Sequence, residues 1–305
     1  MVATLKLAIT GATGFVGARL LDAALSGGHH VRALTRRPQP PLDGVTWVHG
    51  ALDRAASLDA LVEGADAVIH VAGVVNSPVT AGFEAGNVIG TGAMLGAAEK
   101  AGIARFVHVS SLAAREPRLS LYDASKARAE ALVAASPLAT AIARPPAIYG
   151  PGDRELLEMF KMAARGVVLL PPPGWLSLLH VDDLARLLLA LAAPAAPSGL
   201  TVEPDDGHSG GWAHDEFADL LGAAVGRKVR TVSMPQLVMA AAARADRLLH
   251  GARAKLTPDR AAYFCHPDWV ADPAKAVPLE LWQPAIATLQ GLTETAAWYR
   301  SNNLL

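Results

Sequence analysis

Two patterns of apolar and polar positions alternate along the first half of the chain. Short apolar runs bounded by glycine or polar residues are typical of buried strands, and they lie at residues 5–10, 30–35, 45–48, 67–71, 105–109 and 140–143. Between these runs apolar residues recur every three or four positions, which predicts helices at about 14–26, 57–63, 83–101 and 121–135. Because strand and helix alternate, we expect an α/β fold with a parallel sheet covered by helices on both faces.

The pattern changes after Arg144. Closely spaced prolines interrupt the following stretch and predict loops and short elements. An amphipathic helix is expected at 182–192, and alanine-rich helices are expected at about 212–224, 235–250 and 285–300. We therefore expect three parts: a first domain at 1–165, a segment returning to its sheet at 166–203, and a smaller, mostly helical lobe at 204–305.

The composition narrows the kinds of partner. Of 305 residues, 51% are apolar and 18% are charged, so a large core is available. A formal net charge of -1 offers no basic surface for nucleic acid. The single cysteine, the absence of a signal-peptide pattern and the lack of an unbroken apolar span predict a cytoplasmic protein without a membrane span. The ten histidines lack the spacing of metal ligands, so no metal site is predicted.

Three glycines lie between the first predicted strand and the first helix. Gly11, Gly14 and Gly17 allow the chain to turn tightly, approach a pyrophosphate and pack a helix against the sheet. The helix N-terminus would then offer free N–H groups and the positive end of its dipole. An ordinary turn before a helix is the alternative, but the strand–turn–helix context favours a dinucleotide. Its predicted contacts are Gly11, Thr13, Gly14, Phe15, Val16 and Gly17.

The end of the second strand indicates which dinucleotide binds. A carboxylate at this position accepts from the ribose 2′-hydroxyl of NAD, whereas an arginine accommodates the 2′-phosphate of NADP. The chain has Arg36 and Arg37 here and no acid in reach. Both guanidinium groups suit bidentate pairing with a phosphate, although two solvated loop arginines would give the same pattern. We predict NADP as the cofactor, with NAD less favoured.

A tyrosine and a lysine share one face of the helix predicted at 121–135. Tyr122 and Lys126 are four positions apart, so their side chains point the same way. A nearby ammonium stabilises a phenolate, which suits proton transfer. Two unrelated surface residues would have the same spacing, but these follow the fifth strand of a nucleotide-binding sheet. Ser110 and Ser111 stand at the carboxyl end of that strand, where such sheets bind ligands.

These motifs together resemble the short-chain dehydrogenase/reductase family, in its extended or atypical branch, also described as NAD-dependent epimerase/dehydratase-like. The matching residues cover nearly the whole chain: Thr10–Gly17, Val71–Gly73, Asn87, Ser110, Ser111, Tyr122, Lys126, Arg144–Gly152, His180–Ala185, Gly291, Leu292, Trp298 and Tyr299. The resemblance implies a Rossmann-type doubly wound parallel sheet with a smaller C-terminal, mostly helical substrate lobe. Residues 1–165 would then bind NAD(P), and residues 204–305 would bind the substrate.

The resemblance also implies roles for individual residues. Tyr122 would be the general acid/base, Lys126 would hold the nicotinamide ribose and lower the pKa of Tyr122, and Ser111 would bond the substrate carbonyl, with Ser110 as the alternative. Asn87 would support the lysine through a water, or serve only as a packing amide. The remaining cofactor contacts would be Leu52, Val71, Ala72, Gly73, Pro145 and Ile148. One departure is Ala51, which stands where the family often has an aspartate beside the adenine; Asp53 is a weak substitute.

Three functions fit these residues. The first is an NADP-dependent oxidoreductase that moves hydride between nicotinamide and a carbonyl/alcohol carbon. The second is a nucleotide-sugar epimerase or dehydratase with tightly bound NAD; Arg36 and the short gap between Ser111 and Tyr122 argue against it. The third is a non-catalytic sensor or assembly protein that binds NADPH; the intact trio of Ser111, Tyr122 and Lys126 argues against it. The apolar region after residue 200 indicates a hydrophobic small-molecule substrate, and the family often forms homodimers.

Overall fold

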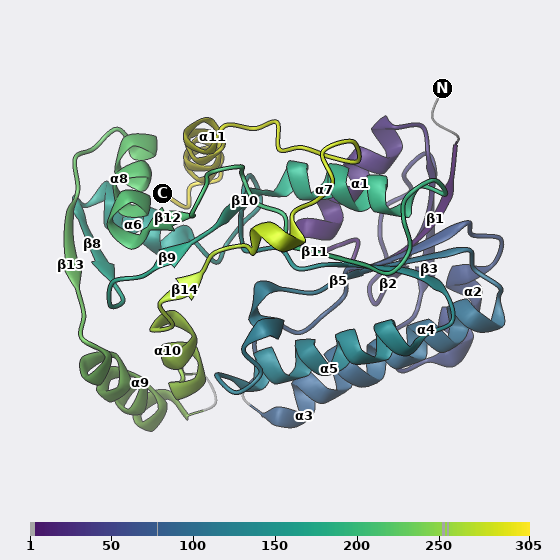
Figure 1. The fold of residues 1–305 in the computed structure, drawn as a ribbon, viewed down its shortest axis with the longest axis horizontal. Coiled ribbons are helices and arrows are strands. Elements are labelled where there is room, and N and C mark those ends of the chain that lie inside the picture. The colour runs from purple at the N-terminus through teal and green to yellow at the C-terminus, as the bar shows by residue number, and fades with distance from the viewer. Residues whose placement is uncertain (1–3, 78, 252–253, 255) are drawn as a thin grey trace. The chain divides into compact units, whose positions relative to one another are not determined.

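The computed structural model describes residues 4–77, 79–251, 254 and 256–305 (Figure 1). By their contacts these residues form two compact units, each built from three chain segments. Unit 1 contains the chain up to Pro145 together with Leu184–Glu203 and Lys275–Gln283, and unit 2 contains Pro146–Asp183, Pro204–Ala274 and Pro284–Leu305. Segments of unit 1 and segments of unit 2 therefore alternate along the chain. That 1–165 binds the cofactor and 204–305 the substrate stays a prediction.

Unit 1 holds a seven-stranded sheet in which every pair of neighbours is parallel. The strands, in spatial order, are β11 (Leu200–Val202), β6 (Ala139–Ala143), β5 (Arg105–Val109), β4 (Ala67–His70), β1 (Lys6–Thr10), β2 (His30–Thr35) and β3 (Val45–His49). The central strands are apolar on both faces because both faces are covered. The strand order reverses between β1 and β4, and the carboxyl edge at such a switch point is where sheets of this kind bind ligands. This confirms the predicted Rossmann-type fold.

Helices cover both faces of this sheet (Figure 1). Helices α1 (Phe15–Ser26) and α7 (Val181–Ala192) lie on one face, and α2 (Ala55–Val62), α4 (Gly90–Lys100) and α5 (Leu121–Ala135) lie on the other. Helix α5 has the predicted bounds. Its first turn is capped by the Ser120 hydroxyl, which accepts from the Asp123 N–H at 3.1 Å.

The helix predicted at 83–101 is not a uniform α-helix. It consists of α3 (Thr80–Phe83), the π-helical segment η1 (Glu84–Ile89) and α4. Glycines let it approach the strand ends closely: a Cβ at Gly86 would lie 2.4 Å from Val74 Cγ2, and one at Gly90 would lie 2.7 Å from Leu52 Cδ1. Wide π-type turns occur often at functional sites, and this one contains Asn87.

Unit 2 combines helices with three small sheets. Its helices are α6 (Leu157–Ala164), α8 (His214–Val225), α9 (Gln236–His250), α10 (Pro258–Phe264) and α11 (Thr288–Ser301). Its strand pairings are β7 (Ala147–Tyr149) with β10 (Leu178–His180), β8 (Val167–Leu170) with β13 (Arg230–Ser233), and β9 (Trp175–Leu176) with both β12 (Trp212–Ala213) and β14 (Asp268–Trp269). The sequence predicted three of these helices but none of the short strands, which contain too few residues to show an alternating pattern.

A buried group of charges joins the three segments of unit 1. Glu203, whose side chain is fully buried, accepts from Arg144 and Arg115, each at 3.1 Å, and lies 3.6 Å from the Lys275 ammonium. Arg144 also forms a two-pronged ion pair with Glu130, at 2.8 and 2.5 Å. These bonds raise the pKa of Arg144, with the Glu130 hydrogen bond as the largest cause. The end of β11 is thereby fastened to the first and third segments.

No helix in the described stretches of the chain is long and apolar enough to cross a lipid bilayer.

Candidate active site

The glycine-rich turn after β1 has the geometry predicted from its spacing. Gly11 has a φ of +74°, and a Cβ there would lie 2.8 Å from the Ala72 nitrogen. A Cβ at Gly17 would lie 2.0 Å from the Gly11 carbonyl oxygen. Helix α1 can therefore pack against the turn only because position 17 has no side chain. This closeness sets where the N-terminus of α1 lies.

The N-terminus of α1 offers backbone donors. Its first helical bond runs from the Ala18 N–H to the Gly14 carbonyl at 2.8 Å, so the N–H groups of the preceding positions have no acceptor within the helix. Gly14 caps the helix with no side chain that could compete for these donors. Thr13 and Gly14 are exposed, and Phe15 and Val16 are half-buried. The turn and helix end fit the pyrophosphate of a dinucleotide.

A histidine that the sequence did not single out holds this turn in place. The Thr10 hydroxyl bonds His70 Nδ1 at 2.8 Å and accepts from the Ala72 N–H at 3.1 Å. His70 Nε2 lies 3.2 Å from the Thr91 hydroxyl, which donates to the Asn87 carbonyl at 2.7 Å. Burial lowers the pKa of His70 to about 3, so its ring is neutral. Since Thr91 already donates to Asn87, it accepts from Nε2–H, and Nδ1 accepts from Thr10.

This chain of bonds connects two predicted cofactor-binding segments with the segment that carries the predicted catalytic residue Asn87. It joins the glycine-rich turn after β1, the turn of Val71, Ala72 and Gly73 after β4, and the π-helical turn with Asn87. Val71 and Ala72 are half-buried, and Gly73 is exposed. The only sequence signal was the polar residues at the ends of β1 and β4.

The predicted contacts for the adenosine end lie after β2 and β3. Arg36 and Arg37 are exposed, and no carboxylate pairs with either one in the described part of the chain. The Thr35 hydroxyl donates to the Arg37 carbonyl at 2.6 Å and orders the start of this loop. Leu52 is half-buried, with its Cδ1 close to the position that a Cβ on Gly90 would take.

Ser111 and Tyr122 are brought together at the carboxyl end of β5. Ser111 caps the short helix η2 (Leu112–Arg115) by accepting from the Ala113 N–H at 3.2 Å, and its side chain also hydrogen-bonds the phenol of Tyr122. Burial raises the pKa of Tyr122 to about 12, while the Ser111 bond lowers it and Asp123 raises it further. The phenol is therefore protonated at neutral pH and in contact with a second hydroxyl.

Lys126 and Asn87 both lie close to Gly73: a Cβ there would be 3.8 Å from Lys126 Nζ and 3.1 Å from Asn87 Oδ1. The Lys126 ammonium is buried and donates to the Val109 carbonyl at 2.8 Å. Desolvation lowers its pKa to about 8, against a raising effect of Glu130. Asn87 uses its whole amide: Oδ1 accepts from the Val74 N–H at 2.6 Å, and Nδ2 donates to the Val74 carbonyl at 2.9 Å and to the Ser125 hydroxyl at 2.8 Å.

Lys126, Asn87 and Ser110 differ in how their polar groups are bonded. The Lys126 ammonium donates to the Val109 carbonyl, and the main influences on the pKa of Tyr122 are burial, the Ser111 hydrogen bond and Asp123. Asn87 packs and bonds Val74 and Ser125, while its Oδ1 would lie 3.1 Å from a Cβ on Gly73. Ser110 is buried, and its hydroxyl has no hydrogen-bond partner within the described chain. The roles assigned to these side chains stay predictions.

The two remaining predicted cofactor contacts fall in different units. Pro145 follows β6 by two residues in unit 1, and its carbonyl accepts from the Leu112 N–H at 3.1 Å. Ile148 is half-buried in the middle of β7, in unit 2.

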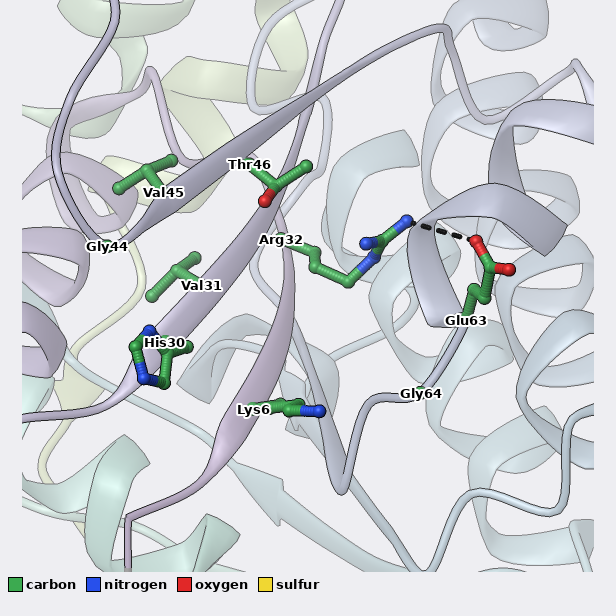
Figure 2. Close-up of a pocket in the computed structure, with 9 residues that line it drawn as sticks. All are labelled: Lys6, His30, Val31, Arg32, Gly44, Val45, Thr46, Glu63 and Gly64. Carbon is green, nitrogen blue, oxygen red and sulfur yellow. Dashed lines mark ion pairs between the residues drawn. The ribbon is translucent and has the colours of Figure 1, made fainter.

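A cavity of about 350 Å³ lies at the opposite, amino edge of the sheet, beside the first residues of β1, β2 and β3. Figure 2 shows the Arg32 guanidinium in this cavity turned towards the Glu63 carboxylate, 3.5 Å away. Arg32 also donates to the carbonyls of Ala60 and Leu61, at 2.5 and 3.1 Å. The Arg32 guanidinium is therefore already paired with a carboxylate and hydrogen-bonded to two carbonyls. The cavity is separate from the predicted cofactor-binding edge of the sheet. Nor does the described part of the chain contain a group of three or more His, Cys, Asp or Glu that could hold a metal.

Comparison with known proteins agrees with this geometry. Residues 7–201 match the NAD dependent epimerase/dehydratase family. The chain belongs to this family. It is accordingly an enzyme of the NAD(P)-dependent oxidoreductase and epimerase type, and the resemblance inferred from its motifs is confirmed.

Known proteins differ in how closely they resemble this chain. The ceramide reductase of Caulobacter vibrioides is 38% identical over an alignment of 304 positions, which covers 97% of this chain and 94% of that protein. The 4-hydroxy-2-methyl-3-oxo-4-farnesyl-3,4-dihydroquinoline-1-oxide ketoreductase of Stigmatella aurantiaca is 34% identical over 52% of this chain and 54% of its own length. Among solved structures, the Bordetella bronchiseptica enzyme WbmG in complex with NAD and UDP has a TM-score of 0.77 at 19% identity and covers 99% of this chain and 97% of its own. The last likeness concerns the fold alone.

Proposed function

We propose that this protein is an NADPH-dependent reductase of a ketone on a long-chain lipid of the ceramide class. The observation that carries the proposal is the contact between Ser111 and Tyr122, with the pKa of Tyr122 raised to about 12. A reductase needs a proton donor at the carbonyl oxygen, and a phenol that stays protonated at neutral pH meets that need.

The substrate class follows from the comparison that spans nearly the whole chain, which is with a ceramide reductase. A ceramide carries a secondary hydroxyl, and the ketone at that carbon is the form that a hydride can reduce. A second relative is named a ketoreductase of a farnesylated ring, so both names describe large, mainly apolar molecules. This agrees with the hydrophobic substrate expected from the sequence.

The cofactor proposed is NADP. The glycine turn and the N-terminus of α1 would bind its pyrophosphate, and Arg36 and Arg37 would bind the 2′-phosphate. When bound, the reduced cofactor supplies the hydride that the carbonyl carbon accepts.

Each residue of the trio has one proposed task. Ser111 donates a hydrogen bond to the substrate oxygen and orients it, and Tyr122 donates its proton to that oxygen, leaving a phenolate that is reprotonated from solvent. Lys126, held by the Val109 carbonyl, places a positive charge behind the tyrosine and offers its remaining protons to the cofactor ribose. Asn87 fixes the start of α5 through Ser125, whose hydroxyl donates to the Tyr122 carbonyl at 2.7 Å.

Purified protein is expected to oxidise NADPH when given the ketone form of a short-chain ceramide, and to make the secondary alcohol. NADPH absorbance and mass spectrometry of the lipid measure the reaction. UDP-glucose is the control substrate, because the nucleotide-sugar alternative predicts its epimerisation with no net use of NADPH. Protein that carries stoichiometric NAD and converts only the nucleotide sugar would show that the reductase proposal is wrong.

Arg36→Ala is expected to weaken NADPH binding by about ten- to a hundredfold and to leave NADH binding within about twofold. The lost contact is a charge-assisted hydrogen bond to a phosphate that NADH lacks. Titration calorimetry with both dinucleotides measures the effect, and Arg165→Ala, at an exposed arginine in unit 2, is the matched control. Equal affinity for both dinucleotides, unchanged in Arg36→Ala, would contradict the NADP assignment.

A further inference from the structure

Helix α9 turns its most apolar side chains to solvent. Leu237, Leu248 and Leu249 are 84, 87 and 79% exposed, and Val238 is 50% exposed. In a helix with 3.6 residues per turn these four side chains lie within about a third of the circumference, together with the exposed Ala241 and Ala245. Isolated exposed leucines are ordinary, but a continuous apolar stripe along one helix marks an interaction surface.

The opposite side of α9 is the one that packs on the protein. Met239 and Ala243 are buried, and α10 is the neighbouring helix (Figure 1). Met239 and Ala243 make this contact, so the exposed leucines are not needed to hold α9 in unit 2. The stripe is therefore available for a partner outside the described chain.

Charge along α9 indicates which partner fits. Arg244 and Arg247 are exposed on one flank of the stripe, and neither has a carboxylate partner among the residues that the structure describes. Asp246 is the acidic residue of this helix. Its carboxylate bonds His250 Nδ1 at 2.6 Å and accepts from the Leu256 N–H at 2.7 Å. An apolar stripe with a cationic flank is complementary to a lipid surface that carries negative headgroups.

We propose that α9 is an interfacial anchor that lays Leu237, Leu248 and Leu249 into the headgroup region of an anionic bilayer. The fifteen-residue helix, about 22 Å long, would lie flat in the membrane plane. A second copy of the chain fits less well. An antiparallel pair of α9 helices would bring each Arg244, near the helix centre, towards its counterpart with no acid to compensate.

The proposal goes beyond the reductase function and does not depend on it. It states where the protein meets a lipid, whatever reaction follows. Binding is therefore measured on the full chain without substrate or dinucleotide, so that failure of one proposal leaves the other standing.

Co-sedimentation with vesicles tests the anchor. The protein is expected to bind vesicles of phosphatidylcholine mixed with phosphatidylglycerol, and to bind phosphatidylcholine vesicles or high-salt mixtures more weakly. The double substitution of Leu237→Gln with Leu248→Gln is expected to lower the partition coefficient by at least about tenfold, since two apolar side chains no longer leave water. Arg244→Gln and Arg247→Gln should each lower it by about fivefold on the anionic vesicles.

Leu279→Gln is the matched control, because Leu279 is 72% exposed and lies outside α9; vesicle binding should not change. Thermal melts of all variants should coincide with the parent, since the substituted side chains are exposed. Equal binding to neutral and anionic vesicles, unchanged binding in the leucine variants, or no binding would overturn the proposal. A concentration-dependent dimer that the α9 variants abolish would assign the stripe to a second copy and overturn it as well.

Discussion

Tyr122→Phe is expected to lower kcat/KM for ketone reduction by about a thousandfold, within the range that a positioned general acid contributes. The ring remains to pack against Phe83, its neighbour at 6.2 Å between centroids, and only the hydroxyl that bonds Ser111 is lost. NADPH affinity is expected to stay within about threefold, because the proton is needed in the transition state rather than for binding. Steady-state kinetics and calorimetry together separate the two effects.

Tyr149→Phe provides the matched control for that substitution. Tyr149 is fully buried in unit 2, and among the described residues its hydroxyl makes only a long bond to the Thr288 carbonyl, at 3.4 Å. Removing it should leave kcat/KM unchanged and alter the free energy of unfolding by no more than about 1 kcal/mol. If Tyr122→Phe keeps the parent rate, the proton comes from another group, and the assignment of Tyr122 is wrong.

Glu203→Gln is expected to reduce the free energy of unfolding by about 3 kcal/mol or more. The substitution keeps the shape of the side chain but removes the charge that compensates Arg115, Arg144 and Lys275. Removing the buried negative charge leaves the cations around it with less compensation for their desolvation, which costs more than a single ion pair contributes. Urea unfolding followed by tryptophan fluorescence and circular dichroism measures the change.

Glu155→Gln makes the same chemical change at the surface. Its carboxylate lies 3.2 Å from Arg260 and is 69% exposed, so the loss should be no more than about 1 kcal/mol. If the Glu203 and Glu155 variants unfold at similar urea concentrations, the buried ion pairs do not stabilise the attachment of β11 to unit 1.

The sequence predicted the main sheet well because the signals there are local. The strands around Ala8 and Val107 are short apolar runs with both faces buried, and the helix from Leu121 to Ala135 begins at a capping serine. The glycine turn could also be predicted, because a Cβ at Gly17 would clash with Gly11, which is only six positions away in the sequence. Family membership and the Rossmann-type sheet are confirmed for this reason.

Structural features that depend on contacts between residues far apart in the sequence could not be predicted from local patterns. The His70 bonds to Thr10 and Thr91, and the Glu203 bonds to Arg115 and Arg144, join positions far apart in the chain. The short strands of unit 2 are set by their partners rather than by their own pattern. The direction of the Lys126 ammonium is likewise fixed by the Val109 carbonyl, which spacing alone does not reveal.

The interleaved make-up of unit 1 has a consequence for synthesis. A nascent chain that has emerged as far as Pro145 has six strands of the main sheet, but β6 is then an open edge, and Arg115 and Arg144 have yet to meet Glu203. The edge is covered only when β11 arrives, and Lys275 follows later still. We expect an early folded intermediate with an exposed strand edge, which is the kind of surface that other chains can join.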